Sequence, residues 1–119
     1  MKRAIKVGQV VGPYSPAIET SRKKQIFVSG QIASNLDADI ATQTREIMNK
    51  IETILGEADA FLSDIAKTTI YLADMNDFSN VNEEYAKFFP SDPPARATIQ
   101  VAALPLGARI EIEAIAFRN

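Results

Sequence analysis

The chain has 119 residues, of which 46% are apolar and 24% are charged, with a formal net charge of −2 and no histidine or cysteine. This size and composition predict one globular domain over residues 1–119 and exclude a disordered chain. The weakly acidic balance gives no attraction toward nucleic acid or an anionic membrane, and the missing histidine and cysteine exclude disulfides, thiolate chemistry and the usual zinc sites.

The N-terminal quarter predicts a loop and one strand. The charged residues 1–6 are not followed by the apolar segment of a secretory signal, and no apolar run is long enough to cross a bilayer, so we expect a cytoplasmic protein. Gly12–Pro16 is a turn-rich loop whose two prolines fix φ on either side of Tyr14. Gln25–Gly30 is a short apolar strand that ends at a glycine.

Two segments have a helical period, and each has a single apolar stripe. The first helix is expected from Ile40 to about Ala58, with Asp37 or Asp39 as its N-cap. The second is expected to begin after Asp74–Asn76 and to end at Pro90. The two stripes consist of Ile47, Ile51, Ile54, Leu55 and Ala58 in the first helix, and of Phe78, Val81, Tyr85, Phe88 and Phe89 in the second.

Three further strands are expected. Ile65–Leu72 is β-branched and aromatic, and Pro94–Ala103 and Ala108–Phe117 are joined by Leu104–Gly107, which we expect to be a hairpin loop. Since each helix has only one apolar stripe, both should cover the same face of one sheet, which makes an α+β two-layer sandwich. The other face needs a cover, and a symmetric oligomer would provide one.

Side-chain alternation selects one register for the expected hairpin. Pairing Ala103 with Ala108 gives an apolar face toward the helices, in which Ile99 is opposite Ile112 and Val101 is opposite Ile110. The uncovered face then carries Arg96, Thr98 and Gln100 opposite Ile115, Glu113 and Glu111. In this register Arg96 and Glu111 lie about 13 Å apart along the strands, so we expect no salt bridge between them within one chain.

Arg96 is the leading chemical feature of the chain, because it stands inside an apolar strand and few other reactive side chains are present. An arginine stays protonated at any working pH and cannot act as a base, but its planar fork suits a carboxylate. Two interpretations follow from the pattern. Arg96 either forms a structural ion pair with Glu113 or holds a small anionic ligand.

Other candidate residues have structural explanations as well. Glu111 and Glu113 can be solvated charges, and Asn82 on the apolar face of the second helix can satisfy backbone groups. Tyr14 can be a loop anchor, and Ser29–Gly30 can be turn residues only.

Five stretches together resemble the YjgF/RidA family, from about Val7 to the C-terminus. They are GPYSPA at 12–17, FVSGQI at 27–32, KTTIYLADMNDFSNVNEEYAKFF at 67–89, PPARATIQVAALP at 93–105 and IEIEAIA at 110–116, in the family's order and near its spacing. The resemblance implies a chorismate-mutase-like sandwich, with one mixed sheet of about six strands and two helices on one face. It also implies a homotrimer whose sheets pack into a central barrel, with ligand clefts between subunits.

The activity that the resemblance implies is the hydrolysis of reactive 2-enamine and 2-imine acids to 2-keto acids and ammonia, without metal or cofactor. The substrates would be 2-aminoacrylate/2-iminopropanoate and 2-iminobutanoate. Arg96 matches the family arginine that holds the substrate carboxylate, and Glu111 matches a glutamate associated with water or proton handling. The other matched positions are expected to contact substrate: Tyr14, Ser29, Gly30, Asn82 and Thr98.

The chain departs from the family at three places. Thr98 stands where a cysteine is frequent, the loop after Gln31 is shorter than in many members, and Asp59 replaces a glycine that often closes the first helix. The alternative functions are a non-enzymatic module that binds small carboxylates and, less favoured, an endoribonuclease. An acidic chain without histidine offers no phosphate track and no obvious base for RNA cleavage.

Overall fold

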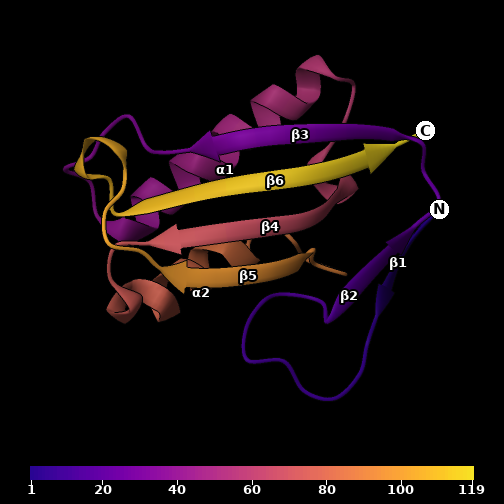
Figure 1. Cartoon of the computed structure of the whole chain (residues 1–119), viewed down its shortest axis with the longest axis horizontal. Helices are drawn as coiled ribbons and strands as arrows, with labels where there is room; N and C mark the ends of the chain where they lie inside the picture. Colours follow the sequence, from indigo (N-terminus) through magenta and orange to yellow (C-terminus); the bar gives the residue numbers. More distant parts are fainter.

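The computed structural model describes residues 1–119 and contains two helices and six strands (Figure 1). The helices are α1 (Ile40–Glu57) and α2 (Phe78–Ala86). The strands are β1 (Lys2–Ile5), β2 (Ala17–Thr20), β3 (Lys24–Gln31), β4 (Ile65–Leu72), β5 (Ala95–Gln100) and β6 (Ile110–Arg118). Neither helix combines the length and apolar character that a bilayer crossing requires.

The main sheet has four strands in the order β3-β6-β4-β5, and both helices cover the same face of it (Figure 1). It is mixed, because β4 and β5 run parallel while the other neighbours are antiparallel. The α+β class and the two helices on one face are therefore confirmed. The single sheet of about six strands is wrong, since β1 and β2 are only four residues long and pair with each other as a separate ribbon.

The expected hairpin between the last two strands is also wrong, because β4 lies between β5 and β6 and pairs with both. Ile70 is opposite Thr98 on one side and opposite Ile112 on the other, so these side chains share a face. It is the face that the helices cover, since Ile70 and Ile112 are fully buried. Three polar residues expected on the uncovered face belong to this side instead, namely Arg96, Thr98 and Gln100. Ile99, expected toward the helices, is on the uncovered face and is 46% exposed.

The first helix begins as its sequence predicts. Of the two candidate caps, Asp39 is the one used, and its Oδ1 accepts a hydrogen bond from the Thr42 backbone N at 2.7 Å. Three residues of the expected stripe are fully buried, but Ala58 is half-buried and Ile54 is 37% exposed. The helix is followed by Asp59 at φ +56°, the left-handed conformation that a family glycine would adopt freely and that aspartate tolerates.

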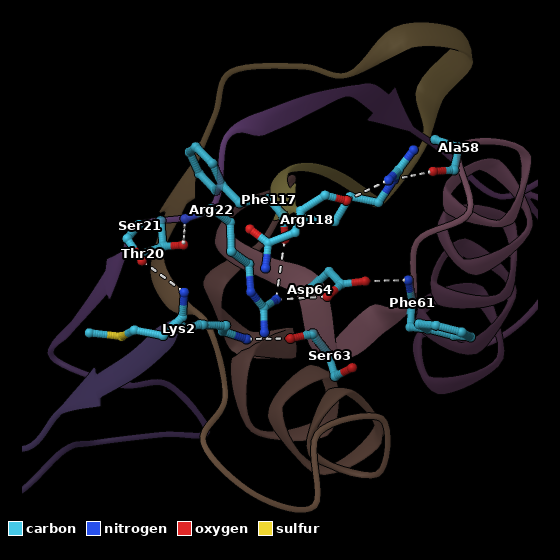
Figure 2. A network of polar contacts seen from close by, with 12 residues as sticks. Lys2, Thr20, Ser21, Arg22, Ala58, Phe61, Ser63, Asp64, Phe117 and Arg118 are labelled. Atoms are coloured by element: carbon cyan, nitrogen blue, oxygen red, sulfur yellow. Dashed lines mark hydrogen bonds and ion pairs between the residues drawn. The ribbon is translucent and has the colours of Figure 1, made fainter.

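A polar network fastens the β1–β2 ribbon and the adjoining chain to the sandwich (Figure 2). Arg22 Nη1 donates to Asp64 Oδ1 at 2.8 Å and to the Phe117 carbonyl at 3.3 Å. Lys2 Nζ donates to the Ser63 carbonyl at 2.6 Å. The ribbon is thereby held at the end of the sheet where β6 finishes, and the loop between β1 and β2 reaches the segment that leads into β5.

Candidate functional site

Arg96 lies on β5, the edge strand of the main sheet, and its side chain extends toward α2. Arg96 Nη1 donates to Asn82 Oδ1 at 2.8 Å. The guanidinium carbon also lies over three aromatic rings, 5.4 Å from the centroid of Tyr14, 5.6 Å from Phe78 and 5.3 Å from Tyr85. These distances are within the range of cation–π attraction. Asn82 therefore contacts the arginine rather than only backbone groups.

The loop between β1 and β2 closes over this arginine. A Cβ built on Gly12 would lie 3.0 Å from Arg96 Nη2 and 3.2 Å from Asn82 Nδ2, so the absence of a side chain permits the close approach. Three residues further on, the Ser15 backbone N donates to the Pro94 carbonyl at 3.1 Å, and the Ser15 hydroxyl donates to the Pro93 carbonyl. The loop is thus fixed to the segment that leads into β5.

The charge of Arg96 has no acidic partner, because none of the ion pairs in the chain includes it. Partial burial lowers the pKa of Arg96, although an arginine remains a cation at working pH. The proposed ion pair with Glu113 is wrong, since Glu113 accepts a hydrogen bond from the Tyr71 hydroxyl on the other face of the sheet. Arg96 and Lys67 are the only charged residues that line an adjoining groove of about 670 Å³.

A buried hydroxyl pair lies behind the arginine. Tyr85 and Thr68 are both fully buried, and their hydroxyl oxygens are 2.9 Å apart in a hydrogen bond. Burial raises the pKa of Tyr85 to about 12, so this hydroxyl is neutral at physiological pH. Thr68 is also the residue on β4 that stands opposite Arg96. The pair fixes the ring of Tyr85 beneath the guanidinium.

Glu111 belongs to a second group of side chains, on the uncovered face of the sheet. A Cβ built on Gly30 would lie 2.7 Å from Glu111 Cδ, so the carboxylate occupies the space beside that glycine. Gly30 is part of an irregularity in β3, where the register with β6 shifts between Val28 and Gln31. Tyr71 stands opposite Glu111 on β4, and the hydrogen bond to Glu113 and the burial of its ring raise the pKa of Tyr71.

The candidate residues therefore form two groups within one chain. The arginine group consists of Tyr14, Asn82, Arg96 and Thr98, on β5, α2 and the loop before β2. The glutamate group consists of Ser29, Gly30 and Glu111, on β3 and β6. Strand β4 separates β5 from β6, which places the two backbones about 10 Å apart, and the side chains leave opposite faces. The expectation that Arg96 and Glu111 form no salt bridge within one chain is confirmed.

Thr98 adds unused hydrogen-bonding capacity to the arginine group. Its hydroxyl oxygen is buried and has no hydrogen-bond partner within the chain. It stands two residues from Arg96 on the same side of β5. A hydroxyl of this kind can serve a ligand that reaches the strand edge.

The sequence pattern predicted Phe78 and Tyr85 as core residues only, although both rings contact Arg96 in the structure. Phe78 and Tyr85 lie on the same face of α2 as Asn82, at spacings of four and three residues, which is the signal that could have assigned them to the site. No three acidic, histidine or cysteine side chains come close enough together to hold a metal ion.

Comparisons with known proteins identify the family of the chain. A family model described as Endoribonuclease L-PSP matches residues 3–118. The human protein named 2-iminobutanoate/2-iminopropanoate deaminase is 42% identical over 115 residues, covering 92% of this chain and 82% of its own. Protein DfrA of Myxococcus xanthus is 39% identical over 114 residues, covering 91% of this chain and 87% of its own.

A solved structure extends the likeness to the whole fold. The Yersinia pestis protein YyfB, described as a protein of unknown function of the conserved Rid family, superposes with a TM-score of 0.86 at 25% identity and covers 98% of both chains. The family model spans nearly the whole chain, and the human and Myxococcus xanthus relatives exceed 30% identity over most of their length. The chain therefore belongs to the YjgF/RidA family, whose model is described as Endoribonuclease L-PSP.

Proposed function

We propose that this protein is a hydrolytic deaminase of small 2-imine and 2-enamine acids, with 2-iminopropanoate and 2-iminobutanoate as substrates. The observation that carries the proposal is the guanidinium of Arg96, which is held by Asn82 and aromatic rings and has no carboxylate partner. Such a group binds a substrate carboxylate through charge-assisted hydrogen bonds. Names of relatives at about 40% identity support the substrate class.

The chemistry needs few protein groups. A protonated imine is already electrophilic at carbon, so water adds to it, and the resulting carbinolamine expels ammonia and leaves the 2-keto acid. In this proposal Arg96 holds the carboxylate, and Glu111 orients the water and accepts its proton. Backbone groups at Ser29–Gly30 and the hydroxyl of Thr98 hold the nitrogen. Tyr14 and Asn82 flank Arg96 on the side of the site that binds the substrate carboxylate.

One chain does not bring these groups together, so we propose that the site forms between subunits of a homotrimer. The arginine group is at the β5 edge of the sheet and the glutamate group is near the β3 edge. Head-to-tail association would juxtapose the two groups, and such a ring closes at three subunits if each contact turns the next copy by a third of a circle. The uncovered face presents Phe27, 69% exposed, and Ile99, which such packing would bury. Light scattering tests the assembly, and a stable monomer would contradict it.

The activity is tested by timing keto-acid release when a serine or threonine dehydratase generates the imine. We expect the protein to accelerate release, and Arg96→Ala to abolish the gain. Arg3→Ala is the matched control, because Arg3 is an exposed arginine that pairs only with Glu19 at 2.9 Å. No acceleration over buffer by the wild-type protein would overturn the enzymatic proposal.

The second candidate is a module that binds small carboxylates without chemistry. One observation favours it. Within a single chain Arg96 is already held by Asn82, whereas Glu111, the residue proposed to activate water, lies on the other face of the sheet. Keto-acid binding without accelerated release would identify this function. The endoribonuclease description of the family model finds no support in the chain's charge or in its lack of histidine.

A further inference from the structure

The side chain of Arg96 is enclosed by aromatic rings from two parts of the chain. Phe78 is in the first turn of α2 and Tyr85 is in its last turn, while Tyr14 comes from the loop before β2. The guanidinium carbon lies 5.3 to 5.6 Å from all three ring centroids. We call these three rings the arginine cage.

The cage differs from the usual environment of a partly buried arginine. Buried charges in proteins are normally paired with an opposite charge, which neutralises them. Here the only side-chain hydrogen bond goes to the neutral amide oxygen of Asn82. Ring faces attract a cation through their quadrupole but carry no net charge. The cage therefore holds the guanidinium in place and leaves its full positive charge available.

The rings differ in how firmly they are fixed. Tyr85 is fully buried, its hydroxyl is bonded to Thr68, and its ring packs against Phe89 with centroids 4.9 Å apart. Phe78 is half-buried and packs against the core. Tyr14 belongs to a loop, where its hydroxyl accepts a hydrogen bond from the Val11 backbone N at 3.4 Å. Two walls of the cage thus belong to α2, and the third belongs to a surface loop.

We propose that Phe78 and Tyr85 are positioning residues for Arg96, which hold its guanidinium in one orientation as a cation without an acidic partner and so make the site selective for a carboxylate ligand. They act through the arginine and do not contact the reacting atoms. The inference rests on the proposed function for the identity of the ligand, but the existence and effect of the cage can be measured without any ligand.

The ligand-free test is the NMR resonance of the Arg96 Nε–H group, assigned by its loss in Arg96→Lys. Ring currents should move this resonance away from those of the exposed arginines in the wild-type protein. It should move back toward them in Phe78→Leu and Tyr85→Leu. Tyr85→Phe is the matched control, since it removes the hydroxyl and keeps the ring, and its resonance should stay near the wild-type position. An unchanged resonance in both leucine variants would overturn the proposal.

The functional test uses 2-oxobutanoate as the probe, with 2-oxobutanamide as its neutral counterpart, in calorimetric titrations. We expect the leucine variants to bind 2-oxobutanoate about tenfold more weakly, which is the order of a desolvated cation–π contact. Binding of the neutral amide should not change, and Tyr85→Phe should bind the acid about as well as the wild type. With imine substrate, KM should rise while kcat changes little, because the lost interaction is uniform binding.

The outcomes separate the two proposals. Leucine variants that lose the shifted resonance but keep wild-type affinity and KM would overturn the positioning role. A wild-type protein that neither binds 2-oxobutanoate nor accelerates imine hydrolysis would overturn the proposed function, and the arginine resonance would then decide the cage by itself. If circular dichroism shows that Tyr85→Leu is unfolded, Phe78→Leu carries the test, because Phe78 is only half-buried.

Discussion

The carboxylate of Glu111 occupies the space that a side chain at Gly30 would need. A Cβ on that glycine would lie 2.7 Å from Glu111 Cδ, closer than a real Cβ approaches another side chain, and 3.0 Å from Cγ. The two residues come from β3 and β6, at the point where the pairing of these strands becomes irregular. The glycine thus sets the position of the carboxylate that we propose to activate water.

Gly30→Ala should therefore displace Glu111 and abolish most of the deaminase activity while the chain still folds, because the far end of a glutamate can move aside. Activity is measured by keto-acid release and folding by thermal unfolding. Gly56→Ala is the matched control, since a Cβ there would have no neighbour within 4 Å. It should keep activity and stabilise the helix by about 0.5–1 kcal/mol. Full activity in Gly30→Ala would contradict the role of Glu111.

Asn82→Asp should weaken carboxylate binding without unfolding the protein. The substitution is nearly isosteric and places an acid 2.8 Å from Arg96 Nη1, where it would neutralise the guanidinium. We expect 2-oxobutanoate to bind about tenfold more weakly or worse, measured by calorimetry, and the melting temperature to stay the same or rise. Asn80→Asp makes the same change on the exposed side of α2 and should have no effect on binding.

Thr68→Val should destabilise the fold by about 1–3 kcal/mol, because it leaves the buried hydroxyl of Tyr85 without a partner. Tyr85→Phe should destabilise the fold by a similar amount, because it leaves the buried hydroxyl of Thr68 without a partner. The double variant should be more stable than the sum of the single effects predicts, since neither hydroxyl then remains. Urea unfolding of the four proteins measures the coupling, and strict additivity would mean that the hydrogen bond contributes nothing.

Asp39 should make stability sensitive to acid. Its hydrogen bonds with Thr42, first of all the one from the backbone N, lower the pKa of Asp39 below its usual value. A lowered folded-state pKa means that the stabilisation is present above the unfolded-state pKa and is lost as pH falls through the folded-state pKa. Asp39→Asn keeps a cap but not the charge, so its unfolding free energy should fall less between neutral pH and pH 3. Asp37 caps no helix, so Asp37→Asn is the matched control for the loss of a carboxylate just before α1.

Local patterns predicted the elements of this fold better than their arrangement. The period of α1, a cap at Asp37 or Asp39 and the β-branched β4 were all predictable from the sequence, because each depends on neighbours a few residues away. Strands β1 and β2 were not located, since each has only four residues and weak alternation. The pairing of β5 with β6 was predicted wrongly because alternation along two strands says nothing about a third strand inserted between them.

The wrong pairing of β5 with β6 limited what could be predicted of the site. Arg96 was identified from its residue type and from the family motif around it, but it was assigned to the wrong face of the sheet. Its contacts with Phe78 and Tyr85 depend on the β4–α2–β5 crossover, which brings residues of α2 beside β5. Apolar periodicity explains both aromatic residues as core, so the pattern gave no reason to look further.

The central place of β6 also sets the order in which the molecule can be made. This strand is the last in the chain, yet it pairs with β3 on one side and β4 on the other. While residues 110–118 are still inside the ribosome, β3 has no neighbour in the main sheet and the pairs that join the two halves cannot form. Within the main sheet the emerging chain can pair only β4 with β5 in advance, and the sheet closes after residues 110–118 have emerged.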